Sequence, residues 1–129
     1  MKSLLLKDQY PVKVLELPKS EAKFQSVDEV LSDLKNKIEN HPVAVYIATF
    51  DHFSHTKSIP EHKMAEDIKD VKNIIFCFGK ELPKSAMASV RPRSIAVADE
   101  GEKFVISFMD APNDAAQDSM ISWVEDLKK

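Results

Sequence analysis

The segment that most constrains the fold is the apolar run of residues 43–50, Val-Ala-Val-Tyr-Ile-Ala-Thr-Phe. Its β-branched and aromatic residues predict a strand. Apolar side chains fall on both faces of that strand, with Val45 and Ile47 on one face and Ala44, Tyr46 and Phe50 on the other. A strand with one solvated face would alternate apolar and polar residues. The run therefore predicts a strand that is covered on both faces.

Four further segments have the length and apolar character of strands, namely residues 12–17, 73–78, 94–98 and 103–109. The last two flank Asp99-Glu100-Gly101-Glu102, a short linker whose glycine favours a hairpin. We expect a mostly antiparallel sheet of about five strands.

Two segments have the three- and four-residue apolar spacing of helices. The first follows Ser26 and Glu29, which have the spacing of a capping box, and should end near Asn40 because Pro42 disfavours helical geometry at the residue before it. The second begins near Pro112. A short helix is expected around residues 64–70, within the polar connection of residues 54–71. The apolar stripes are Val27, Val30, Leu31, Leu34 and Ile38 in the first helix, and Ala116, Met120, Trp123 and Leu127 in the second.

The order of these elements is β-α-β-(short α)-β-β-β-α, which predicts an α+β fold. We expect a two-layer sandwich of one sheet and two main helices. Two helices cover only one face of such a sheet. The other face must meet a loop, a ligand or a second copy of the chain, and we expect a homodimer.

Composition limits the class of protein. A chain of 129 residues can bury a sizeable core, and we expect a single domain over residues 1–129. The net charge of -3 gives no reason to expect nucleic acid. No apolar run approaches the roughly 20 residues of a membrane helix, and none resembles a signal peptide. One cysteine cannot form an internal disulfide, so we expect a cytoplasmic protein.

Several short motifs occur in one order: Phe50-Asp51-His52, residues 75–79 (Ile-Phe-Cys-Phe-Gly), residues 91–94 (Arg-Pro-Arg-Ser), residues 98–103 (Ala-Asp-Glu-Gly-Glu-Lys) and residues 110–112 (Asp-Ala-Pro). Over residues 24–112 the chain resembles small bacterial families of unknown function. The resemblance implies a compact α+β domain that pairs with itself, and it implies no catalytic residues. His55 and Cys77 lie outside the pattern.

The first candidate site contains His52 and His55, whose spacing can place two imidazoles on one metal ion. Asp51, His62 or Cys77 could complete the ligands, and zinc accepts such a mixture of nitrogen, oxygen and sulfur. The alternatives are that Asp51 and His52 bond to the loop after the strand while His55 is solvated, or that they contact a small ligand.

Cys77 is a second candidate because Lys80 lies close in sequence and a nearby cation lowers the pKa of a thiol. His52 could serve as its base if the two strands are neighbours. The alternatives are a small apolar residue of the core, a redox sensor or a metal ligand.

Arg91 and Arg93 are the best candidates for binding an anion, because guanidinium groups match carboxylates and phosphates. In an extended segment both side chains project to the same side, beside Lys80 or Lys84. The alternative is a salt bridge to Asp51 or Asp99, or pairing across a dimer interface.

No catalytic residue and no cofactor is predicted. The favoured interpretation is a small homodimeric binding or accessory domain that holds a small acidic ligand with Asp51, His52, Lys80, Arg91 and Arg93. One alternative is a metal- or thiol-dependent protein that uses His52, His55 and Cys77, with zinc or another transition metal. The other is a protein-interaction subunit without a small-molecule ligand.

Overall fold

The computed structural model describes residues 1–129, which form one six-stranded antiparallel sheet. The strands lie side by side in the order β1-β2-β6-β5-β4-β3. The last four follow one another along the chain, and the hairpin of β1 and β2 is added beside β6. The strands are β1 (Lys2–Leu6), β2 (Tyr10–Pro18), β3 (Val45–Phe50), β4 (Asp70–Cys77), β5 (Arg93–Asp99) and β6 (Lys103–Met109).

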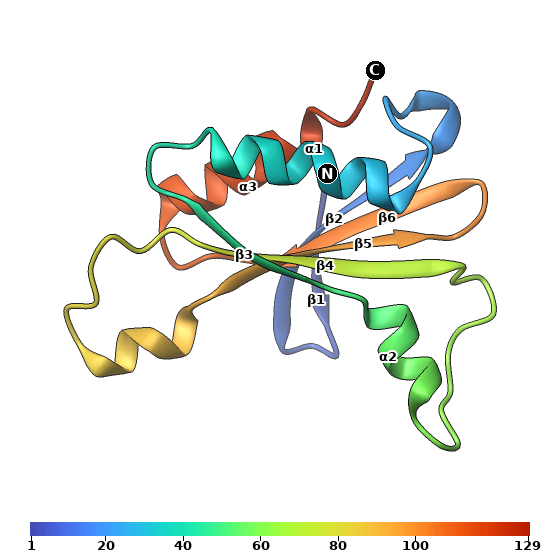
Figure 1. The fold of residues 1–129 in the computed structure, drawn as a ribbon, viewed down its shortest axis with the longest axis horizontal. Helices are drawn as coiled ribbons and strands as arrows, with labels where there is room; N and C mark the ends of the chain where they lie inside the picture. Colours follow the sequence, from blue (N-terminus) through green and yellow to red (C-terminus); the bar gives the residue numbers. More distant parts are fainter.

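Two helices, α1 (Val27–Glu39) and α3 (Asp114–Glu125), lie next to each other over one face of the sheet (Figure 1). Helix α1 carries the chain from β2 across the sheet to its edge strand β3. A third helix, α2 (His52–Ser58), lies beyond the end of β3 on the other side of the sheet. Two 3-10 helices complete the fold, η1 (Lys19–Glu21) and η2 (Ser85–Val90). None of these helices combines the length and the apolar character that a membrane span requires.

The core lies between the sheet and the α1–α3 pair. Every second residue of the central strands faces it, and Ile74, Phe76, Ile95, Phe104 and Ile106 are completely buried. All members of the predicted apolar stripes of both helices are buried, and all of them except Ala116 belong to the same core as these residues. Each such side chain contributes roughly 1.5–3 kcal/mol on burial, so this layer is the main source of stability.

The predicted capping box is confirmed at the start of α1. Ser26 Oγ accepts a hydrogen bond from the backbone N–H of Glu29 at 3.2 Å and donates one to its carboxylate at 3.0 Å. The helix ends at Glu39, with Asn40 as its C-cap. Local signals therefore predicted both ends of this element.

The α+β class and the antiparallel sheet are confirmed, but the expected numbers of strands and helices are corrected to six strands and three α-helices. The missed strand is β1, which joins β2 through Lys7 and Asp8 at φ of 52° and 56°. Hairpin turns of this conformation usually carry Asn and Gly. The sequence therefore gave no turn signal at this point.

The short helix lies at the other end of its connection from the position expected. Helix α2 begins directly after β3, where Asp51 accepts a hydrogen bond from the backbone N–H of Ser54 at 3.0 Å. Residues 59–69 contain no helix or strand, and β4 begins at Asp70. Asp51 is thus a helix cap as well as the residue that follows the strand.

The second face of the sheet is apolar, and no helix lies over its centre (Figure 1). Val45 and Ile47 on β3 are 63% and 52% exposed, and only the far end of this face, at Phe50 and Asn73, lies against α2. We call it the open face; the strand pairing places on it Lys2, Leu4, Leu6, Tyr10, Val12, Val14, Glu16, Pro18, Val45, Ala48, Phe50, Val71, Asn73, Ile75, Cys77, Ser94, Ala96, Ala98, Lys103, Val105, Ser107 and Met109.

Candidate functional site

The predicted site residues fall at two opposite ends of the sheet. Strands β3 and β4 are antiparallel, with Phe50 paired to Asn73 and Val45 paired to Cys77. These two pairs are four residue steps apart, which corresponds to about 14 Å along a strand. The structure therefore does not bring Asp51 and His52 together with Lys80, Arg91 and Arg93.

The end that contains the histidines is held by hydrogen bonds and ring contacts within the chain. Nδ1 of His52 lies 2.9 Å from Oδ1 of Asn73. The rings of His52 and His55 lie 5.0 and 5.2 Å from the ring of Phe50, measured between centroids, so both pack on this aromatic side chain. Cys77 lies at the other end of the sheet, and no three His, Cys, Asp or Glu side chains are grouped as metal ligands.

Cys77 lies on the open face and is half-buried. Its sulfur accepts a hydrogen bond from the backbone N–H of Gly79 at 3.4 Å. Lys80 and Arg91 line the same shallow hollow as Cys77, whereas His52 lies at the opposite end of the strands. The pairing of Cys77 with a histidine base is therefore not formed.

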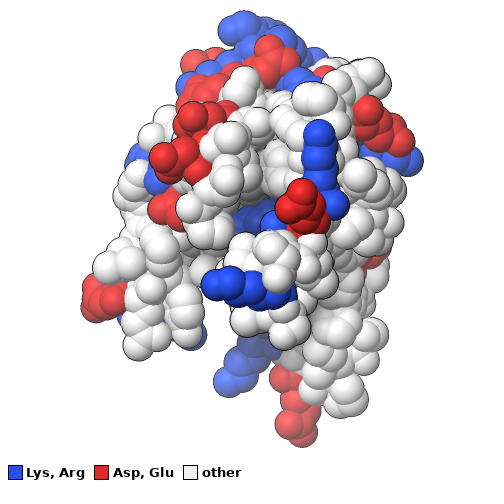
Figure 2. Space-filling view, turned by 90° about the vertical axis from the view of Figure 1, so that its left-hand side faces the viewer, with Lys and Arg blue, Asp and Glu red and all other residues white.

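The other end of the sheet contains a cavity of about 350 Å³. Its walls come from the turn after α1, the end of β4, η2 with the start of β5, and the first turns of α3. Figure 2 shows this side of the molecule hollowed, with basic atoms inside the hollow. Two of the thirteen lining residues are Arg91 and Arg93, and none is acidic.

Neither arginine forms an ion pair. All salt bridges within 4.0 Å use lysines or the terminal amino group. The guanidinium of Arg91 donates to the backbone carbonyl of Glu81, and that of Arg93 donates to the carbonyl of Met109. Nε of Arg93 is buried and has no partner. The alternative pairing with Asp51 or Asp99 does not occur, since Asp51 caps α2 and Asp99 binds Lys19 at 2.9 Å.

Burial lowers the pKa of Arg93, and the neighbouring carboxylate of Asp110 opposes that shift. Asp110 itself is bound elsewhere. It accepts hydrogen bonds from Lys13 at 2.9 Å and from Gln117 at 2.6 Å, and these partners hold its own pKa below the usual range. Arg93 thus keeps a partly desolvated positive charge whose nearest carboxylate is already shared with other donors.

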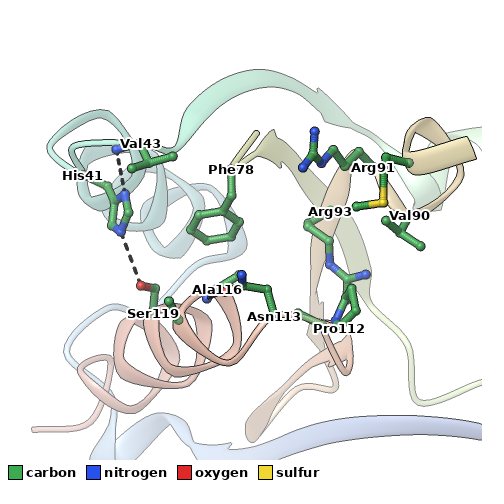
Figure 3. Close-up of a pocket in the computed structure, with 13 residues that line it drawn as sticks. His41, Val43, Phe78, Val90, Arg91, Arg93, Pro112, Asn113, Ala116 and Ser119 are labelled. Carbon is green, nitrogen blue, oxygen red and sulfur yellow. Dashed lines mark hydrogen bonds between the residues drawn. The ribbon is translucent and has the colours of Figure 1, made fainter. Parts of the chain in front are cut away.

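One wall of the cavity is aromatic. The rings of Phe78 and His41 line the cavity (Figure 3). Behind them, Phe78 stacks on Trp123 with centroids 5.6 Å apart, and His41 meets both rings edge-on. Val43 and Ala116 extend this apolar surface toward α3. A ligand here would meet apolar contacts along one side and guanidinium groups at one end.

His41 and Ser119 lie together at the opposite end from Arg93 (Figure 3). Nδ1 of His41 accepts backbone N–H hydrogen bonds from Val43 and Ala44, both at 3.0 Å. These two donors require Nδ1 to be unprotonated, so in neutral His41 the proton is on Nε2, which donates to Ser119 Oγ at 3.3 Å. A serine nucleophile needs the reverse arrangement, with a nitrogen that accepts its proton. This hydrogen-bond direction therefore suits the binding of a ligand and does not activate Ser119 as a nucleophile.

Asn113 adds a donor beside Arg93. Its Oδ1 accepts a hydrogen bond from the backbone N–H of Ala116 at 3.1 Å and caps α3, which leaves its amide nitrogen without a partner in the chain. Sequence reasoning missed His41, Phe78, Asn113 and Ser119 as site residues. Asn113 alone carried a usable signal, because Asn before an apolar helical stripe is a preferred N-cap.

The chain belongs to a family of unknown function (DUF6858), which matches residues 1–129. The resemblance to a family without an established function is thereby confirmed. Neither a curated protein nor a solved structure matches the chain.

Proposed function

We propose that this protein binds a small organic anion in the cavity between α1, η2 and α3. The observation that carries the proposal is that both arginines of the chain line this one cavity and neither is paired with a carboxylate. A desolvated cation without a partner is costly to maintain, and an incoming oxyanion would offset that cost. Guanidinium groups suit carboxylates and phosphates equally well by geometry.

The remaining lining supports an anion that carries an apolar group. No acidic side chain faces the cavity, so nothing there repels a negative charge. The amide nitrogen of Asn113 and the start of α3 add favourable partial charge beside Arg93. The ring of Phe78, held in place by stacking on Trp123, offers contact to a flat or aliphatic portion of the ligand.

The proposed role is binding without catalysis, as a sensor, carrier or accessory domain. His41 is oriented as a donor to Ser119, and Cys77 has no histidine beside it. Neither the Ser119 hydroxyl nor the Cys77 thiol therefore has an activating base.

We propose a reducing compartment such as the cytoplasm, on the ground that the chain has a single cysteine.

The experiment is a titration of the protein with benzoate, a carboxylate of suitable size, followed by calorimetry and by amide chemical shifts. We expect saturable binding, with shifts in residues 110–119, and at least a tenfold weaker affinity in Arg93→Gln. Lys63→Gln is the matched control, because it removes a positive charge from the far side of the molecule. Equal affinity in both variants, or shifts that avoid the cavity, would contradict the proposal.

We also propose that two copies of the chain associate through the open face. Most residues of this face are uncharged, and the charged ones are Lys2, Glu16 and Lys103. Glu16 is bonded to both Lys2 and Lys103, each at 3.0 Å, so these three charges largely offset one another within the chain and leave little net charge to repel a second copy. Six strands spaced about 4.8 Å apart give a footprint of roughly 600 Å² per copy, at the lower end of stable interfaces. Native mass spectrometry at micromolar concentration tests it; a monomeric mass contradicts it.

A further inference from the structure

From the orientation of Ser119 we infer that the ligand carries a second, neutral hydrogen-bond acceptor, such as a ketone or ether oxygen, in addition to its anionic group. This inference rests on the proposed function of the cavity. It specifies the chemical class of anion that the cavity selects. The class is an organic acid with an anion at one end, an acceptor at the other and an apolar spacer between them.

The hydroxyl group of Ser119 accepts a hydrogen bond from His41, and this fixes the direction in which it can donate its own proton. Because His41 is held as a donor toward Ser119 Oγ, the hydroxyl proton of Ser119 points away from the imidazole. No backbone carbonyl of α3 accepts that proton, so the chain leaves it without a partner. Ser119 therefore offers a donor into the cavity, and a ligand group beside it must supply an acceptor.

The acceptor has to be neutral. The side chains around Ser119 that line the cavity are His41, Val43 and Ala115, none of which carries an unpaired positive charge. A second carboxylate would lose its hydration there in exchange for a single hydroxyl donor, which does not compensate a buried charge. A carbonyl or ether oxygen loses much less and is satisfied by one hydrogen bond.

The two polar ends are separated by the length of the helix that joins them. Asn113 caps α3 and Ser119 lies six residues later, which places them about 9 Å apart along the axis. Ala115 and Ala116 lie between them, and their small side chains leave room for a spacer against Phe78. At roughly 30 Å³ for each water-sized group, a cavity of about 350 Å³ holds about a dozen non-hydrogen atoms.

A matched pair of probes tests the inference. In 4-acetylbenzoate the ring separates a carboxylate from a ketone oxygen, whereas 4-isopropylbenzoate has nearly the same shape and no acceptor. We expect 4-acetylbenzoate to bind the unmodified protein several-fold more tightly. In Ser119→Ala this preference should disappear while the affinity for 4-isopropylbenzoate stays within about twofold. Alanine is tolerated in a helix, so the variant should fold.

The outcomes separate the inference from the function on which it rests. If both probes bind with equal affinity, and both are weakened by Arg93→Gln, then the anion site stands and the inference fails. If the preference for the ketone persists in Ser119→Ala, another residue donates the hydrogen bond to the ketone oxygen, and the inference also fails. If neither probe binds, the proposed function fails together with the inference.

Discussion

Gly79 lies directly under the guanidinium group of Arg91. A Cβ atom at position 79 would be 2.7 Å from Cζ of Arg91, which is closer than two carbon atoms can approach. The neighbour is the flexible end of a side chain, so a methyl group here displaces the arginine and leaves the backbone in place. Gly79 is therefore a positioning residue for one of the two cations of the cavity.

Gly79→Ala should weaken benzoate binding several-fold with a change in unfolding free energy of less than about 1 kcal/mol. Calorimetry and urea denaturation measure the two effects. The control is the double variant with Arg91→Gln, in which the alanine should have no further effect on affinity. An additive loss in the double variant would show that Gly79 acts on binding by another route.

Arg93→Met should abolish anion binding without a comparable loss of stability. The positive charge is partly desolvated and unpaired, and methionine retains much of the apolar stem. We expect the unfolding free energy of the ligand-free variant to stay within about 1 kcal/mol of the parent value. Urea denaturation without ligand measures it, and a loss of several kcal/mol would mean that the guanidinium is a structural group.

The ion pair of Lys13 and Asp110 should make stability dependent on acid pH. The hydrogen bond from Lys13 is the main cause that lowers the pKa of Asp110, with Gln117 second. A carboxyl group with a lowered pKa in the folded state stabilises the protein above its unfolded pKa of about 3.9, and that stabilisation is lost as the pH falls through the folded value.

Lys13→Met should therefore reduce the unfolding free energy at pH 7 by roughly 0.5–1 kcal/mol, because the pair is only partly exposed. At pH 2.5, below the unfolded value of about 3.9, the difference from the parent should be smaller, because the contribution of the pair declines as the pH falls toward the lowered pKa of the folded state. Urea denaturation at the two pH values measures this, with Lys63→Met as a control that has no ion pair. A difference that stays constant with pH would mean that the methionine acts through packing.

Elements with local signals could be predicted from the sequence, and the cavity could not. Helix α1 has a cap, an apolar stripe and a proline just beyond its end, and β5 and β6 flank a linker whose glycine has a φ of 91°. By contrast, His41, Phe78, Arg91 and Ser119 are far apart in the chain and come together only through packing. The arginines were found because their chemistry is specific; the polarity of Ser119 depends on hydrogen bonds that no motif contains.

Two features of the predicted site residues depend on tertiary structure. Two of the residues grouped as one site, Asp51 and His52, follow β3 and a third, Lys80, follows β4, but antiparallel neighbours finish at opposite ends of a sheet. Gly79 has no positive φ, and its lack of a side chain leaves space for Arg91. Strand direction and side-chain approach are tertiary properties, which single-sequence patterns do not encode.

His41→Ala should destabilise the fold by about 1–3 kcal/mol, because it leaves the backbone N–H groups of Val43 and Ala44 without their acceptor. His41→Asn should recover part of this loss, since an Asn side chain can accept from the N–H two residues later. Urea denaturation compares the variants. If both lose the same free energy, the contribution of His41 comes from its ring contacts with Phe78 and Trp123.

Ala96→Glu should separate the proposed dimer into folded monomers. Ala96 lies on β5 at the middle of the open face, where it pairs with Asn73 on one side and Ser107 on the other. In a symmetric interface, the new carboxylate would be buried near the same carboxylate of the second copy. The paired residues Asn73 and Ser107 provide no positive charge to compensate it. In the isolated chain the same side chain reaches water, so helix and sheet signals in circular dichroism should be retained.

Sedimentation equilibrium over a range of concentrations measures the effect, and we expect the dissociation constant to rise by at least a factor of 100. Ser32→Glu is the control, because it adds the same charge on the exposed side of α1 and should leave association unchanged. A dimer that survives Ala96→Glu would place the contact away from the centre of the open face, for instance at its edge on the hairpin of β1 and β2. Benzoate binding should be retained in the monomer, because every residue of the cavity comes from one chain.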